Sequence, residues 1–579
     1  MGILKEELRV LENLEREIGG PIPEVKELEY YVFGYMVKNE HITGLGLFSC
    51  GLTSIPDFIT SLKNLKRIYL RGNRLNKISD QFCTLSNIEI LDLSENKLKN
   101  LPDSINRLNS LKELYLESNN LEILPESIGS FKNLEFLDLS ENNLKELPDS
   151  LNNLKNLKTL DLSGNQLSSF NEKLNSLSSL EILYLGNNNL TTLPESIGSF
   201  SSLKRLNLRN NKLLSLADSI GELRALNSLF LKGNTLEFLP DSIENLKNLR
   251  YLGLKENNLN SLPENIGSLL SLENLSISSN NLKKLPISLS SLKSLMRLTI
   301  RDNKLKNLPE SFGELSNLRI LRLDRNFLTD LPESIGKLKK LESLKISRNK
   351  LQSLPETIRS LTSLKELDLY DNMLENLPDS IGFLTSLEIL DLSKNNIKIL
   401  PKSLGKLSSL KELDLSNNKL TSLPETIGNI LLIQNLILGF NRLKTIPQSI
   451  GLLSKLEVLD LGKNILIEIP DSIGSLKSLK YLYLYYNELK DIPESIGKLS
   501  SLKYLYLGNN KIKNIPKSVG KLKSLKYLFL RSNQLTNIEP IYTLKLIKKL
   551  KYLNLEKNKF KEFSDSLTDL EKRGVKIYK

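Results

Sequence analysis

Residues 110–131 read SLKELYLESNNLEILPESIGSF, and close variants of this segment recur along nearly all of the 579 residues. In its first half, leucines alternate with Glu113, Tyr115 and Glu117, which predicts a short strand with one buried face. In its second half, Ile128 and Phe131 can supply the opposite wall of a core. The segment therefore predicts a two-layered unit whose copies stack with their strands in parallel.

The repeat has a length of 23 residues, marked by one asparagine in each copy. The series starts with Asn73, Asn96, Asn119, Asn142 and Asn165 and continues without slippage to Asn510 and Asn533. One period before it lies Cys50, and the last unit takes two extra residues to reach Asn558, which gives 23 repeats over about 42–563. The pattern L-x-x-L-x-L-x-x-N-x-L is the signature of leucine-rich repeats. We therefore expect an α/β solenoid, a horseshoe with a parallel concave sheet and short helical or 3-10 turns on the convex side.

Two polar or rigid positions explain how each copy turns. The asparagine follows the strand, where its amide can pair with backbone groups that would otherwise be buried without partners. Cys50 belongs to a terminal repeat with one neighbour, so a smaller side chain is tolerable there. The proline, as in Pro125, suits the first position of a short helical turn. Looser turns are expected in the four repeats that replace this proline, with Ser79, Asn171, Ala217 and Glu539.

Both ends have sequences that differ from the repeat and predict caps. Residues 3–18 have helical spacing and stop at Gly19-Gly20-Pro21, and residues 31–45 alternate around a turn at 38–40, which predicts a hairpin. Residues 564–574 predict a capped helix, followed by a strand at 575–578. Solenoids need polar caps because their end faces would otherwise expose the core. We therefore expect one whole domain, with a helix and hairpin cap at 1–41, the solenoid at 42–563 and a helix-strand cap at 564–579.

Charge and composition restrict the compartment and the partner. The net charge of +13 would suit nucleic acid or an anionic membrane, but 80 Lys and Arg are mixed with 67 Asp and Glu without a basic tail. The preferred interpretation of this charge is a solvated, lysine-biased surface, and a nucleic-acid partner is not expected. Membrane insertion is not expected either, since no apolar run is long enough to cross a bilayer. The charged start has no signal-peptide core, and the two cysteines form no clamped end caps, so a cytoplasmic location is expected.

The residues that could carry chemistry are few and have structural explanations. His41 is the only histidine, and it is interpreted as a surface turn residue of the hairpin. One histidine with Cys50 and Cys83 cannot build a structural zinc site, and Cys83 occupies a position that is glycine in other repeats. The Gly-Lys pairs precede leucine and lack phosphate-loop spacing. We expect a protein that is not an enzyme and has no metal or cofactor.

The register predicts which side chains face the concave surface, namely those six, four, two and one before each asparagine. Acidic positions are Asp92, Glu95, Glu113, Glu117, Asp138, Glu141 and Asp161, and again Glu366, Asp368, Asp371, Asp391, Glu412 and Asp414. Basic positions are Arg205, Arg209, Lys232 and Lys255, and then Arg297, Arg301, Arg322, Arg325, Lys345 and Arg348. One interpretation of each patch is ordinary solvation with charge pairing between strands. The other is that the alternating acidic and basic stretches orient a protein partner. The acidic stretches would repel the phosphates of nucleic acid. Arg301, Arg322, Arg325 and Arg348 are candidate partner contacts.

Aromatic residues gather on the concave positions of the last repeats. They are Tyr481, Tyr483, Tyr485, Tyr486, Tyr504, Tyr506, Tyr527, Phe529 and Tyr552, in a chain that is only 6% aromatic. One interpretation is a cross-strand ladder that stiffens the sheet before the cap. The favoured interpretation is a binding surface, because exposed aromatic clusters are more often interfaces.

The string LPESIGSFKNLEFLDLSEN at 124–142 resembles the intracellular Ras-group leucine-rich-repeat proteins, which include plant members and an animal scaffold that joins Ras to a phosphatase. The resemblance covers nearly all of the chain and implies protein binding on the concave face, with a small GTPase as one partner. The caps GGPIPEVKELEYYVFGY and LEKRGVKIYK are more similar to those of prokaryotic, including archaeal, cytosolic repeat proteins. Two functions follow: a scaffold or adaptor in small-GTPase-linked signalling, or the recognition arm of a sensor or secreted effector whose activity lies in another chain.

Overall fold

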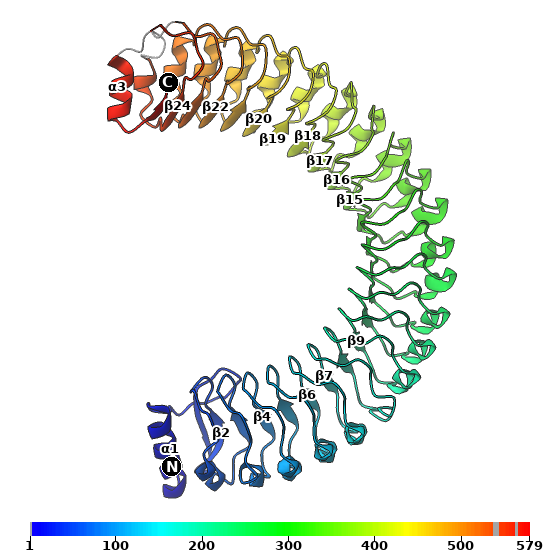
Figure 1. The fold of residues 1–579 in the computed structure, drawn as a ribbon. Coiled ribbons are helices and arrows are strands. Elements are labelled where there is room, and N and C mark those ends of the chain that lie inside the picture. Colours follow the sequence, from blue (N-terminus) through cyan, green and yellow to red (C-terminus); the bar gives the residue numbers. More distant parts are fainter. Residues whose placement is uncertain (1–2, 537–542, 562–564) are drawn as a thin grey trace. The chain divides into compact units, whose positions relative to one another are not determined.

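A computed structural model describes residues 3–536, 543–561 and 565–579, which form two compact units, Met1–Leu282 and Lys283–Lys579. In each unit, strands line the inner side of the curve and short 3-10 turns lie on its outer side (Figure 1). Leucines and isoleucines from both layers fill the space between them and are almost completely buried. The expected repeat solenoid with a parallel sheet and 3-10 turns is therefore confirmed in each unit.

The first unit begins with the helix α1 (Lys5–Ile18) and an antiparallel hairpin of β1 (Gly34–Lys38) and β2 (His41–Gly46). From β2 onward each strand pairs in parallel with the next, and the following strands are β3 (Arg67–Tyr69), β4 (Ile90–Asp92), β5 (Glu113–Tyr115), β6 (Phe136–Asp138), β7 (Thr159–Asp161), β8 (Ile182–Tyr184), β9 (Arg205–Asn207), β10 (Ser228–Phe230), β11 (Tyr251–Gly253) and β12 (Asn274–Ser276). The 3-10 turns are η1 (Asp57–Ser61), η2 (Phe82–Thr84), η3 (Asp103–Arg107), η4 (Glu126–Ser130), η5 (Asp149–Asn153), η6 (Glu195–Ser199), η7 (Asp218–Glu222), η8 (Asp241–Asn245) and η9 (Glu264–Ser268).

The second unit continues the same alternation. Its strands, each parallel to the next, are β13 (Arg297–Thr299), β14 (Ile320–Arg322), β15 (Ser343–Lys345), β16 (Glu366–Asp368), β17 (Ile389–Asp391), β18 (Glu412–Asp414), β19 (Asn435–Ile437), β20 (Val458–Asp460), β21 (Tyr481–Tyr483), β22 (Tyr504–Tyr506), β23 (Tyr527–Phe529), β24 (Tyr552–Asn554) and β25 (Lys576–Tyr578). Its helix α3 (Asp565–Lys572) precedes β25, and its 3-10 turns are η10 (Ile287–Ser291), η11 (Glu310–Glu314), η12 (Glu333–Lys337), η13 (Glu356–Ser360), η14 (Asp379–Phe383), η15 (Lys402–Lys406), η16 (Glu425–Asn429), η17 (Gln448–Leu452), η18 (Asp471–Ser475), η19 (Glu494–Lys498), η20 (Lys517–Lys521) and η21 (Thr543–Leu546).

The asparagines form the expected ladder of hydrogen bonds between neighbouring repeats. The Asn142 side-chain oxygen accepts from the Leu121 amide at 2.9 Å, and its Nδ2 donates to the carbonyls of Leu116 and Leu139 at 2.9 and 3.1 Å. Cys50, at the end of the ladder, makes only a weak contact of 3.5 Å from Sγ to the carbonyl of Phe48. Each buried asparagine thus satisfies backbone groups of its own repeat and of the repeat before it.

The outer turns differ from the sequence prediction in the place of the proline. Pro125 has φ −70° and ψ 151°, so it lies just before the 3-10 turn as its N-cap and is not the first helical residue. The extended ψ directs the proline carbonyl toward the turn, where it accepts from the Ile128 amide at 3.1 Å. The acidic residue after the proline, Glu126, becomes the first residue of the turn.

The repeats without proline behave in different ways. The repeat with Ser79 has a short turn of three residues, and the described segment between β7 and β8, which contains Asn171, forms no 3-10 turn. The prediction of looser turns is confirmed for these two. It is wrong for Ala217, which has φ −63° and ψ 145° and precedes a full turn of five residues, because alanine adopts the proline conformation without the ring. Glu539 and the expected cap boundary at 563–564 lie outside the described residues.

The N-terminal cap contains a contact that sequence interpretation missed. His41 is the first residue of β2 and not a surface turn residue as predicted, and its Nδ1 lies 2.9 Å from Oε1 of Glu7 in α1. Glu7 is only 4% exposed and its second oxygen accepts from the Ile42 amide at 2.6 Å. The pair fixes α1 against the first repeat. At the other end, β25 pairs in parallel with β24. Among the described residues, no helix has the length and apolarity that a membrane span requires.

Candidate binding surface on the inner face

The aromatic patch lies on adjacent strands of the second unit, β21 to β24. We define it as Tyr481, Tyr483, Tyr485, Tyr486, Tyr504, Tyr506, Tyr527, Phe529 and Tyr552. The parallel register stacks these rings in two columns: Tyr481 on Tyr504 and Tyr504 on Tyr527 in one, Tyr483 on Tyr506 and Tyr506 on Phe529 in the other. The sequence reasoning therefore placed these residues together correctly, and Tyr578 of β25, 5.2 Å from Tyr552, adds a ring that it missed.

The ring geometry determines what the aromatic patch can offer a partner. Successive rings lie 4.4–4.7 Å apart with interplanar angles of 2–16°, so neighbouring rings cover each other's faces. All but Tyr486 are half-buried, and burial raises the pKa of Tyr483 and Tyr506, so both phenols stay protonated at neutral pH. The solvent side of the columns consists of ring edges and hydroxyl groups that can donate hydrogen bonds.

Tyr485 and Tyr486 extend the patch beyond the stacked columns. A Cβ on Gly462 would come within 2.4 Å of the Tyr485 ring, so the ring occupies the space that this glycine leaves. Tyr486 is 53% exposed and has φ 55°, the left-handed conformation of the residue before each asparagine. Beside it, the Lys463 ammonium lies 5.6 Å from the Tyr486 ring and 4.2 Å from the Phe440 ring. Lys463 and Phe440 belong to the same column of turn residues and were not identified from the sequence.

The four candidate arginines lie in the same unit but away from the aromatic patch. Arg301 pairs through Nε with the buried carboxylate of Asp324 at 3.0 Å. Arg325 and Arg348 are exposed at left-handed turn positions, and the Arg348 guanidinium lies 5.7 Å from the Tyr370 ring. Six strand steps separate β15 from β21, or roughly 29 Å at the usual spacing. The fold therefore does not bring the arginines and the aromatic patch into one site.

Several acidic positions that the sequence assigned to surface patches are parts of the backbone turn. Asp138 accepts from the Ser140 amide at 2.9 Å, and Asp414 accepts from the Ser416 amide at 2.8 Å. Burial raises the pKa of both carboxyls. The same bond to the residue two positions on is made by Asp92, Asp161, Asp368 and Asp391. These aspartates stabilise the end of their strands, so the accessible negative charge of the two acidic stretches is carried by their glutamates and by Asp371.

A second aromatic cluster, in the first unit, was missed by sequence reasoning. Tyr30, from the loop before β1, lies edge-on to Tyr69 and Tyr115 with ring centroids 5.8 and 5.0 Å away. Tyr69 and Tyr115 are 4% and 8% exposed, and burial raises the pKa of Tyr69 to about 12. The loop thus covers the inner face at β3 to β5. Tyr69 and Tyr115 share one column of the register, which was the available signal.

The described residues contain no group of three or more His, Cys, Asp or Glu side chains arranged to hold a metal ion. Cys50 and Cys83 are both free, and burial raises the pKa of each thiol, which disfavours the reactive thiolate. Cys83 is a buried residue of the outer turn η2, at the position that is glycine in other repeats.

Comparisons with known proteins identify repeats along the chain. Models described as leucine-rich repeat region match residues 241–319, 309–396 and 470–576, and those described as leucine rich repeat match 63–121, 201–259 and 432–489. Shorter models of the same repeat match 132–176, 385–427 and 179–200. A comparison with curated proteins finds no match for the chain.

Solved structures with the same fold come from bacteria and plants. A leucine-rich-repeat protein of Leptospira interrogans is 33% identical, with 72% of this chain and 95% of that one covered and a TM-score of 0.57. The Arabidopsis receptor kinase HAESA, solved with the peptide hormone IDA and a co-receptor, is 29% identical with 96% and 93% covered and a TM-score of 0.63. YopM from Yersinia enterocolitica is 27% identical, with 82% and 91% covered and a TM-score of 0.61.

Proposed function

Because the chain belongs to the leucine-rich-repeat family, we propose that it is a non-enzymatic scaffold or adaptor that binds a protein partner on its inner, strand-lined face. The observation that carries this proposal is the aromatic patch, whose half-exposed rings occupy neighbouring strands β21 to β24. Tyrosine provides contact area and a hydrogen-bonding hydroxyl at low entropic cost, and it is enriched at the energetic centres of interfaces.

The arginines Arg301, Arg322, Arg325 and Arg348 provide a separate, positively charged contact in the same unit. The nearest of them, Arg348, follows β15 and is roughly 29 Å from the aromatic patch, and the other three are farther away. They would therefore meet a different part of the partner, which favours a folded protein over a short peptide. Contacts of this kind mainly raise the association rate and fix orientation. We propose the aromatic patch as the anchor and the arginines as the element that orients the partner.

The class of protein that we predict as the partner is a small GTPase. The resemblance to Ras-group repeats implies a small GTPase and a role in signal transduction, and the accessible glutamates of the inner face argue against nucleic acid. A cytoplasmic location is supported by Cys50 and Cys83, which are both free. A purified small GTPase is therefore the first defined protein to test against the chain.

The second candidate function is the recognition arm of a sensor, whose activity lies in another chain. The similarity to HAESA, a receptor kinase solved with a peptide hormone and a co-receptor, favours this candidate. A peptide ligand would need only one part of the inner face. Substitutions in the aromatic patch and among the arginines would then not both reduce binding.

The experiment uses two double variants of the full chain. Tyr483→Phe with Tyr506→Phe removes two hydroxyls and keeps the stacked rings, whereas Tyr483→Ala with Tyr506→Ala removes the rings as well. The partner is first identified by crosslinking capture from lysate of the source organism, and its Kd is then measured with purified proteins. We expect the phenylalanine variant to weaken binding severalfold without changing the melting temperature, and the alanine variant to weaken it at least tenfold.

The matched control is Tyr184→Phe with Tyr251→Phe, two half-buried tyrosines of the inner face in the first unit. This variant should bind the partner normally. If the alanine variant of the aromatic patch melts much earlier and still binds with the normal Kd, the patch is a stabilising ladder and the proposed site is wrong.

A further inference from the structure

Two pockets open side by side on the outer side of the first unit, where two repeats have lost their proline. The pocket at Asn171 has a volume of about 580 Å³ and the pocket at Ala217 about 350 Å³, within the range of small-ligand pockets, about 300–1,000 Å³. Thr192 lines both of them. We name the pair the outer groove; it lies in a different unit from the aromatic patch and is independent of the proposed function.

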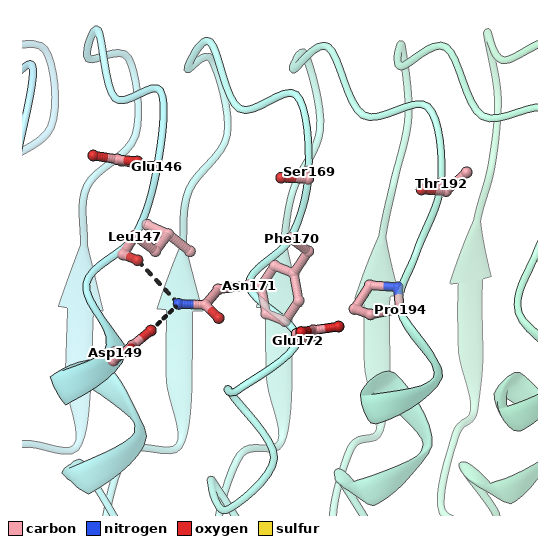
Figure 2. A pocket seen from close by; sticks show the side chains of 9 residues that line it. All are labelled: Glu146, Leu147, Asp149, Ser169, Phe170, Asn171, Glu172, Thr192 and Pro194. Atoms are coloured by element: carbon pink, nitrogen blue, oxygen red, sulfur yellow. Dashed lines mark hydrogen bonds between the residues drawn. The ribbon is translucent and has the colours of Figure 1, made fainter.

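The local sequence explains why the groove forms at this place. Asn171 occupies the position that is proline in most repeats. Its side-chain Nδ2 donates to the Leu147 carbonyl at 3.1 Å and to the Asp149 carboxylate at 2.9 Å (Figure 2). No 3-10 turn follows Asn171, so the wall that η5 and η6 provide in the neighbouring repeats is missing.

Small side chains extend the depression along the repeats. Two residues before the proline position lie Ser169, Thr192 and Ser215, and this row is bounded by the larger Glu146 and Phe238. Phe238 is 56% exposed and lines the far end of the outer groove. The groove therefore has small residues along its length and a larger side chain at each end.

The charge of the outer groove is uniformly negative, in a chain whose net charge is +13. Its lining contains five carboxylates and no basic side chain: Glu146, Asp149 and Glu172 in the first pocket, Glu195 and Asp218 in the second. Lys173 pairs with Asp149 from outside the lining. Within the described part of the chain, no side chain forms an ion pair with Glu146, Glu172 or Asp218.

Two of these carboxylates are held in the ionised form by neighbours. Hydrogen bonds from Asn171 and Lys173 lower the pKa of Asp149, and the Ser219 amide, which donates to Glu195 at 2.9 Å, lowers the pKa of that carboxyl. A small cation would need several converging ligands, and the described residues contain no cluster of three or more such groups. The outer groove instead matches a ligand with separate positive charges and some apolar length.

We propose that the outer groove binds an extended, basic segment of a protein partner, with one lysine or arginine side chain in each pocket. The pockets are centred two repeats apart, which is roughly 10 Å at the sheet and more on the outer side of the curve. An extended chain advances about 3.3 Å per residue and directs alternate side chains to the same side. Cationic residues about four positions apart therefore match the two pockets.

The probe is the fluorescein-labelled peptide GARAAARAG, titrated with the full chain and followed by fluorescence anisotropy. The reference peptides are GARAAAAAG, with one arginine, and GAEAAAEAG, with the opposite charge. We expect saturable binding of the first peptide, at least threefold weaker binding of the second and none of the third. The affinity should fall as salt is raised, because the contacts are ionic.

Two variants test the two parts of the geometry. Glu172→Gln with Asp218→Asn removes one charge from each pocket and should weaken binding at least tenfold. Ala217→Pro fills the second pocket with a ring at an unchanged backbone conformation, since φ is already −63°, and should reduce the advantage of the second arginine to less than twofold.

The matched control, Glu356→Gln with Asp379→Asn, changes the same repeat positions beside Pro355 and Pro378 and should leave binding within twofold of the unmodified chain. Equal losses in the control and in Glu172→Gln with Asp218→Asn would overturn the proposal, as would equal binding of the one-arginine peptide. The chain could also sediment as a dimer that Glu172→Gln with Asp218→Asn dissociates. That result would assign the outer groove to a second copy of the chain and would also overturn the proposal.

Discussion

Replacement of Asn280 by alanine tests whether the asparagine ladder stabilises the fold as its geometry implies. Its Oδ1 accepts from the Leu259 amide at 2.9 Å, and its Nδ2 donates to the Leu254 carbonyl at 2.9 Å. That carbonyl also accepts from Asn257 and keeps this partner in the variant. The buried Leu259 amide is left unpaired, and such a group costs about 1–3 kcal/mol.

Hydrogen exchange is the suitable assay, because a long repeat array opens locally and its melting need not be two-state. A loss of about 1–3 kcal/mol corresponds to exchange that is roughly 5–150-fold faster at Leu259 and the adjacent strand. The control is Cys50→Ala, which removes only the 3.5 Å contact to the Phe48 carbonyl and should cost less than about 0.5 kcal/mol. Equal loss of protection around Cys50 and Asn280, or normal protection at Leu259 in Asn280→Ala, would refute the ladder account.

Three further predictions concern chemistry, the outer turns and pH. The purified protein should bind no stoichiometric zinc and hydrolyse no nucleotide, and turnover that co-purifies through several columns would contradict this expectation. Ala217→Pro should stabilise the chain by about 0.4–1 kcal/mol in denaturant melts, because its φ of −63° already suits proline; a loss of stability would show that the ring clashes. Lys112 and Lys66 lower the pKa of Glu89 from 4.5 to about 2. The two ion pairs therefore stabilise the folded chain above pH 4.5, by under about 1 kcal/mol after solvent screening, and this stabilisation is lost as the pH falls toward 2. Glu89→Gln should therefore be less stable than the unmodified chain at pH 6 and equally stable near pH 2, and a difference that is constant with pH would disprove the assignment.

The repeat pattern was sufficient to predict the positions of the strands and the core. The reason is that every copy repeats the same short-range rules: alternating leucines, a polar turn residue and an outer turn that follows a proline. The error of one residue in the role of Pro125 arose because proline is tolerated both at the N-cap and at the first helical position. Only ψ, which is 151° at Pro125, distinguishes the two, and the residue type does not fix ψ.

Contacts between distant residues were not predictable from the pattern. The pair of Glu7 and His41 joins residues 34 positions apart, and Tyr30 reaches rings of β3 and β5 from a loop without periodicity. Likewise, the sequence places Asp138 on the inner face but does not reveal that its carboxylate accepts a hydrogen bond from the backbone amide of Ser140. A column of identical residues indicates their proximity, whereas their pairing depends on side-chain conformation.

The sequence by itself determined the repeat, the register and the columns of the inner face, because a periodic chain leaves one way to bury its leucines. It placed the nine aromatic residues together for the same reason. The tertiary structure alone decided how those rings stack, that the cap loop covers β3 to β5, and that the losses of proline at Asn171 and Ala217 open one outer groove. These features depend on ring orientation, loop packing and the space between neighbouring repeats, which side-chain identity does not specify until the copies are stacked against one another.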